Sequence, residues 1–160
     1  MPNKHVNAAF DGQSSVGLAM FSETINLRHV IFAGLAAGTW VMVSGLLMAG
    51  IFGYRDMKAA FDAAGLPIPG GAGPFVIHTV VRLIIGMGVV ALFAIFLRVF
   101  SPTQALLAAA GFTWVFGAVL PFAVIVQWGL FSWSLATKLW AWSAAELLIA
   151  ATIGRLLYHP

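Results

Sequence analysis

Residues 75–100 limit what this chain can fold into more than any other part of the sequence. They read FVIHTVVRLIIGMGVVALFAIFLRVF, an almost continuous apolar run with two arginines, Arg82 in its interior and Arg98 near its end. As a helix the run is long enough to cross a bilayer, because a hydrocarbon core about 30 Å thick needs roughly 20 apolar residues. Arg82 falls inside this run, so its charge must find a partner, water or lipid headgroups. The sequence therefore predicts a membrane helix that carries a charged side chain.

The composition extends this prediction to the rest of the chain. Of the 160 residues, 61% are hydrophobic and 8% are charged, whereas a soluble domain carries about 25% charged residues. We therefore expect an all-α, polytopic membrane protein, a four-transmembrane-helix bundle with spans at about 29–53, 75–98, 105–128 and 139–158. Residues 1–28 would form a polar N-terminal tail, and residues 29–160 a single transmembrane domain. The end of the tail is typical of either a short interfacial helix or a simple lead-in to the first span.

Several classes of function are disfavoured by what the sequence lacks. It contains no cysteine, which removes disulfide exchange, thiolate metal sites and covalent haem attachment. Its lysines and arginines form no run, so a clustered basic surface for nucleic acid is not expected. It has no His-Glu-x-x-His or Gly-x-Ser-x-Gly motif and no cluster of carboxylates for a metal pair. We therefore expect a non-catalytic protein, with no cofactor indicated by a motif.

Four polar residues form a candidate binding site within the predicted spans. Antiparallel threading places the beginnings of the second and fourth spans on the same side. His78 and Arg82 are four residues apart and hence on one helix face, and Glu146 should lie at a depth similar to Arg82. Gln127, at the end of the third span, closes the same end of the bundle. We expect Arg82 and Glu146 to face inward and to pair, directly or through water.

This polar cluster has two interpretations. In a functional interpretation it is a proton relay, an anion site or a site for a quinone headgroup, with His78 and Gln127 as hydrogen-bonding groups. In a structural interpretation the Arg82–Glu146 pair fixes the rotation and register of the helices. A haem held by His29 and His78 is not expected within one chain, because these residues begin spans on opposite sides. A single-histidine site or a haem shared between subunits stays open.

Small residues in the first span indicate close helix packing. Gly34 and Gly38 are four residues apart and are followed by Gly45, which lets a neighbouring backbone approach closely. The neighbour would be another helix of the same chain or the same helix of a second copy.

The basic residues outside the spans predict an orientation. Lys4, Arg28, Arg98 and Arg155 fall on one side, and Arg55, Lys58 and Lys138 on the other. The larger number on the first side favours cytoplasmic locations for both termini.

Two segments carry a resemblance to known proteins. AGLAAGTWVMVSGLLMAGIFGY in the first span and LWAWSAAELLIAATIGRLLY in the fourth resemble small, uncharacterised four-span families of bacterial inner-membrane proteins. The resemblance covers the apolar part of the chain and implies a multi-pass protein of the bacterial inner membrane. Because no catalytic residues are assigned in such families, it implies none here.

These observations lead to three hypotheses about function. The first is a non-catalytic accessory or scaffold protein that packs in a homo-oligomer or a larger membrane complex through the glycine-rich face of its first span and its polar N-terminal tail. The second is a small proton-linked carrier that uses the Arg82–Glu146 pair. The third is a quinone- or haem-associated redox subunit that uses His78. The sequence names no substrate and no specific partner.

Overall fold

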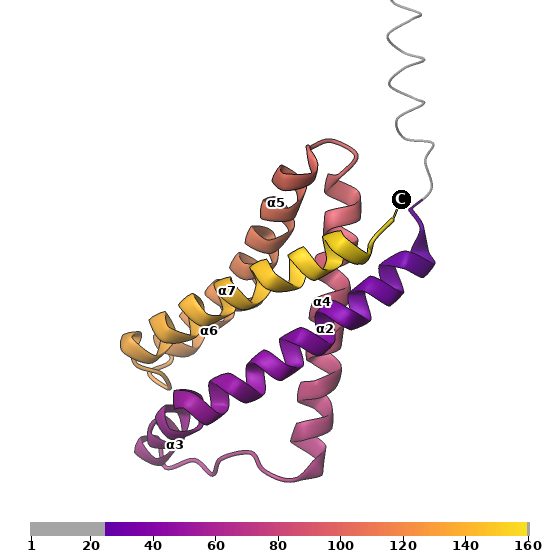
Figure 1. Ribbon diagram of the computed structural model, residues 1–160. Helices are drawn as coiled ribbons and strands as arrows, with labels where there is room; N and C mark the ends of the chain where they lie inside the picture. The colour runs from indigo at the N-terminus through magenta and orange to yellow at the C-terminus, as the bar shows by residue number, and fades with distance from the viewer. Residues whose placement is uncertain (1–24, 160) are drawn as a thin grey trace, which may run out of the picture.

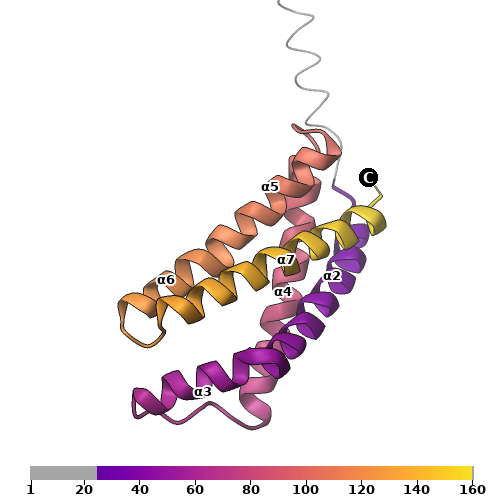
Figure 2. The same cartoon turned by 60° about the vertical axis from the view of Figure 1, so that its left-hand side comes forward.

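The computed structural model describes residues 25–159, and this part of the chain is helical without strands (Figures 1 and 2). The elements in chain order are α2 (Leu27–Met48), η1 (Ala49–Gly53), α3 (Tyr54–Ala63), α4 (Ala72–Phe96), α5 (Pro102–Trp114), η2 (Val115–Val119), α6 (Leu120–Gln127) and α7 (Trp133–Leu157). The expected all-α fold is confirmed for these residues. The predicted N-terminal tail lies outside them, apart from its last four residues.

Three helical segments are long and apolar enough to cross a membrane, judged by length and composition. They are Leu27–Ala63, Ala72–Phe96 and Pro102–Gln127. α7 coincides with the fourth expected span and has 25 residues, but it is not in this group, and it contains Lys138, Glu146 and Arg155.

Local sequence signals set the ends of these helices. The side chain of Asn26 accepts a hydrogen bond from the backbone N–H of His29 at the start of α2. Ser101 and Gln104 form a capping box at the start of α5, where Pro102 takes a position that needs no N–H. Gly65 follows α3 with a φ of 67°, a left-handed conformation that glycine adopts without steric cost.

Two of the long helices contain a π-helical segment that the sequence analysis did not predict. η1 joins α2 to α3, and η2 joins α5 to α6 directly before Pro121. Proline has no N–H for the carbonyl four residues earlier and its ring crowds the preceding turn, so the helix must adjust there. The widened turn of η2 thus lies on the N-terminal side of Pro121, the second residue of α6.

The glycine-rich face of α2 packs against α4. A Cβ atom at Gly34 would lie 2.7 Å from the Cα of Met87, and one at Gly38 would lie 2.8 Å from the Cα of Leu83. From the other side, a Cβ at Gly86 would lie 2.1 Å from the backbone nitrogen of Gly38. The two backbones can approach this closely because side chains are absent at the crossing.

The sequence left two possible neighbours for Gly34 and Gly38, another helix of the same chain or the same helix of a second copy. The neighbour is a helix of the same chain, so packing within the chain is confirmed. α4 already covers this face of α2. Gly45 completes the face in a different way, since its missing side chain makes room for the guanidinium of Arg82, 3.3 Å from where a Cβ would lie.

α7 closes the fold by packing on α2, α4 and α5. Figure 1 shows its C-terminal end beside the start of α2. At this end the ring of buried Tyr158 meets Phe93 edge-on, with centroids 6.3 Å apart. His29 also contacts the C-terminus, where its Nδ1 lies 2.6 Å from the carbonyl oxygen of His159.

Candidate functional site

A cavity of about 330 Å³ lies among the helices, and α2, α3, α4, α5, η2, α6 and α7 all contribute to its wall. Most of the wall is apolar, including Met48, Met57, Ile85, Phe122, Leu139 and Leu147. Six of the lining residues carry hydrogen-bonding side chains on α4, α5 and α7: His78, Arg82, Thr113, Trp142, Ser143 and Glu146. The cavity therefore combines apolar surface with a small set of polar groups.

The polar part of the cavity is organised by an ion pair between α4 and α7. Arg82 Nη1 donates to Glu146 Oε1 at 2.6 Å. The side chain of Glu146 is 3% exposed and that of Arg82 is 18% exposed, so the acid is the more deeply buried partner. The pairing predicted from the sequence is confirmed. The second oxygen, Oε2 of Glu146, has no donor within hydrogen-bonding geometry among residues 25–159, and the Ser44 hydroxyl is the side chain besides Arg82 that acts on this carboxyl group.

Two tryptophans tie α2 and α7 together around this pair. Trp142 Nε1 donates to the hydroxyl oxygen of buried Ser44 at 2.9 Å. Trp40 Nε1 donates to the backbone carbonyl of Glu146 at 3.2 Å. Both hydrogen bonds join α2 to α7, so they fix the position of Glu146 relative to α2. The sequence analysis did not identify Ser44, whose signal is a polar residue next to Gly45 in an apolar helix.

Two hydroxyl groups in the cavity wall donate hydrogen bonds to backbone carbonyls of their own helices. Thr113 Oγ1 donates to the carbonyl of Ala109 at 2.9 Å, and Ser143 Oγ donates to the carbonyl of Trp140 at 3.0 Å. A hydroxyl has one proton and two lone pairs, so in this arrangement the lone pairs of both groups are available as acceptors. Neither residue was identified from the sequence, because such side chains are common in helices and carry no spacing signal of their own.

The structure brings together three of the four predicted binding residues. His78, Arg82 and Glu146 all line the cavity. Gln127 does not, and the prediction that it closes this site is wrong. Gln127 is the last residue of α6 and is exposed, whereas its neighbour Val126 is buried. Successive residues on a helix point about 100° apart, so only one of the two can face the core.

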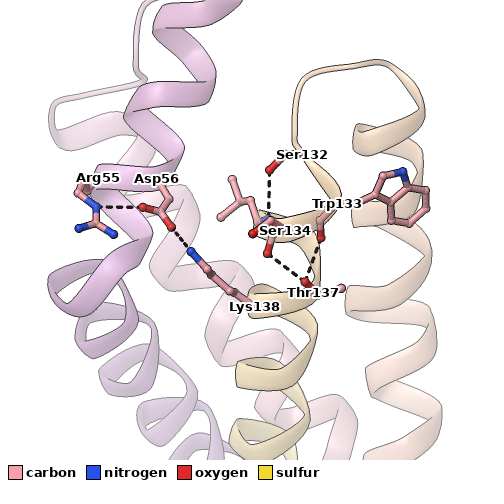
Figure 3. Close-up of polar contacts among 8 residues, drawn as sticks. Arg55, Asp56, Ser132, Trp133, Ser134, Thr137 and Lys138 are labelled. Atoms are coloured by element: carbon pink, nitrogen blue, oxygen red, sulfur yellow. Dashed lines mark hydrogen bonds and ion pairs between the residues drawn. The ribbon is translucent and has the colours of Figure 1, made fainter.

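A second polar contact links α3 to α7 close to the cavity (Figure 3). Lys138 Nζ donates to Asp56 Oδ2 at 2.7 Å, and Arg55 Nε donates to Asp56 Oδ1 at 3.0 Å. Met57, the next residue of α3, lines the cavity. The Asp56–Lys138 ion pair therefore holds α3 against α7 where α3 contributes to the cavity wall.

The described residues do not form a ready metal centre. Within 25–159 no group of three or more histidine, aspartate or glutamate side chains could hold a metal ion. His29 is in the first turn of α2 and His78 in the second turn of α4. The starts of these two helices lie at opposite ends of the structure (Figure 1). The two histidines therefore cannot share one iron within this chain.

Comparison of the chain with models of protein families, with curated proteins and with solved structures finds no match. The functional argument consequently depends on the cavity and its residues.

Proposed function

We propose that this chain is a four-span, non-catalytic accessory protein of a bacterial inner membrane, and that its cavity binds a lipophilic small molecule. The observation that carries the proposal is the cavity of about 330 Å³, with apolar walls and a buried Arg82–Glu146 pair. Small-molecule sites are typically concave, mostly apolar cavities of about 300–1,000 Å³ with a few fixed polar groups. The cavity has this size and this composition.

Four spans are supported by the length of α7 and by the pairing of its charges. Its 25 residues extend about 37 Å at 1.5 Å per residue, enough to cross the hydrocarbon core. Glu146 is paired with Arg82, and Lys138 with Asp56 near the start of the helix. The large exposed side chains of the four long segments include Phe32, Ile84, Phe116 and Ile149, which would face lipid. Polar groups that face inward and apolar groups that face outward suit a lipid environment.

The accessory role expected from the sequence is kept, but it is now supported by the cavity instead of by the glycine-rich face of α2. The scaffold hypothesis used the glycine-rich face of the first span and the polar N-terminal tail. α4 covers the glycine-rich face, and residues 1–24 of the tail lie outside the described part of the chain. Association with further copies or with a larger complex would use a surface other than the glycine-rich face. The carrier and redox-subunit hypotheses would use the same Arg82–Glu146 pair and His78. Binding needs only the cavity and its polar groups, so it is the function that these features support best.

Cysteine labelling will test the number of spans and the orientation. The chain contains no cysteine, so the maleimide labels only the cysteine introduced at an exposed position. We expect Ala64→Cys and Ser134→Cys to react with a membrane-impermeant maleimide in intact cells. Val99→Cys and His159→Cys should react only after permeabilisation. If Ser134→Cys and His159→Cys react from the same side, α7 does not cross the membrane.

A cavity-filling variant will test ligand binding. Gly117 lines the cavity, and a Cβ there would meet nothing closer than Thr113 Cγ2 at 3.8 Å, so Gly117→Phe can fill the space. After purification in mild detergent, native mass spectrometry should find a small lipophile bound to the wild type and lost from this variant. Gly111→Phe, in α5 and outside the cavity wall, is the matched control and should retain it. A wild type without an adduct, or an adduct retained by Gly117→Phe, contradicts the proposal.

A further inference from the structure

We infer that the ligand of this cavity is an uncharged lipophile with a hydroxyl head, of the phenol or alcohol class. The inference rests on the proposed function and adds the chemistry of the ligand. It follows from the charges and the hydrogen-bonding groups at the polar part of the cavity.

The charges of the cavity compensate each other before any ligand enters. Arg82 and Glu146 form a 2.6 Å ion pair, and the surrounding wall is mostly apolar. A carboxylate or an ammonium group would add a charge that this pair does not neutralise. Burying an unpaired charge in such surroundings is costly, so the head of the ligand is uncharged.

The acceptors of the wall require a donor from the ligand. Thr113 Oγ1 and Ser143 Oγ donate to backbone carbonyls of their own helices, and in this arrangement their lone pairs are available as acceptors. Glu146 contributes a third acceptor, because its Oε2 is without a donor among the described residues. Buried polar atoms are normally hydrogen-bonded, and an unpaired one costs free energy. These oxygens on α5 and α7 favour a ligand that carries an O–H.

Arg82 supplies the complementary donors. A guanidinium has five N–H donors and no acceptor. Arg82 Nη1 donates to Glu146 Oε1, the whole side chain is 18% exposed, and Arg82 is one of the residues that line the cavity. A hydroxyl oxygen accepts from Arg82 while its proton goes to one of the acceptor oxygens. An ether or a simple ketone meets Arg82 but offers no donor to Glu146 Oε2.

Three probes with the same hexyl chain test this inference on the full-length protein in lipid nanodiscs. They are 4-hexylphenol, 4-hexylanisole and 4-hexylbenzoate, and affinity is measured by equilibrium dialysis with Gly117→Phe nanodiscs as the partition control. The phenol should bind at least about 10-fold tighter than the anisole, because methylation removes only the donor. The benzoate should bind more weakly than the phenol.

Two variants assign the selectivity to the named groups. In Thr113→Val with Ser143→Ala the preference for the phenol over the anisole should fall several-fold, while the anisole affinity stays the same. In Arg82→Met with Glu146→Leu the preference should disappear. Selectivity that is unchanged in both variants overturns the inference.

The outcomes separate the ligand class from the proposed function. Equal binding of phenol and anisole, above the Gly117→Phe control, overturns the hydroxyl class and leaves a lipophile site. Tightest binding of the benzoate overturns the uncharged class in the same way. If no probe binds the wild type above Gly117→Phe and no lipophile copurifies, the proposed function itself fails.

Discussion

Replacing Gly86 with alanine is expected to separate α4 from α2 and to destabilise the protein severely. The added Cβ would lie 2.1 Å from the backbone nitrogen and 2.2 Å from the Cα of Gly38. These are backbone atoms, so no side-chain rotation relieves the clash and the helices must move apart. Overpacking in a close-packed interior costs about 1–3 kcal/mol, and a backbone clash belongs at the upper end of this range. We expect a loss of about 3 kcal/mol, or no folded protein.

Gly88→Ala is the matched control for this prediction. Gly88 lies two residues further along α4, and a Cβ there would meet nothing within 4 Å. Alanine is also the better helix former by about 1 kcal/mol, so this variant should be as stable as the wild type or more stable. Thermal unfolding of both variants in detergent, followed by size-exclusion chromatography, measures the difference. If Gly86→Ala and Gly88→Ala have the same midpoint, the α2–α4 packing described here is wrong.

Breaking the Arg82–Glu146 pair from one side should cost far more than removing it altogether. Removing one partner of a buried ion pair leaves an uncompensated charge and typically costs about 3–5 kcal/mol, whereas apolar replacement of both is often neutral. We therefore expect Arg82→Met and Glu146→Leu each to be destabilised, and the double variant to be close to the wild type. Arg82→Met should be the worse of the two, because it strands the 3% exposed acid, while Arg82 is 18% exposed and can reach solvent more easily.

A double-mutant cycle measures this coupling directly. Unfolding midpoints of the wild type, the two single variants and the double variant in one detergent give the interaction free energy. Lys58→Met is a suitable control, because Lys58 pairs with Asp62 within α3 and both side chains are at least half exposed. Such an exposed pair contributes little, so this variant should unfold like the wild type. Additive losses in the cycle would show that Arg82 and Glu146 do not depend on each other.

The Arg82–Glu146 pair could be predicted because the sequence leaves few partners for a charge in an apolar segment. Glu146 is the one carboxylate within the predicted spans, and antiparallel threading places it at a depth similar to Arg82. The approach of another helix to Gly34 and Gly38 could be predicted for a similar reason, since small residues four apart form a flat strip. Both predictions depend on residue type and spacing, which the sequence states directly.

The sequence by itself determined that the chain is helical, that its helices are long and apolar, and that Arg82 and Glu146 form an ion pair. Only the tertiary structure decided that Gly86 is the partner of Gly38, that Gln127 stays outside the cavity, and that Thr113 and Ser143 line it. The physical reason is rotation about the helix axis. A shift of one residue turns a side chain by about 100°, and packing against neighbouring helices selects the rotation that gives close van der Waals contact and pairs the polar groups without a backbone clash.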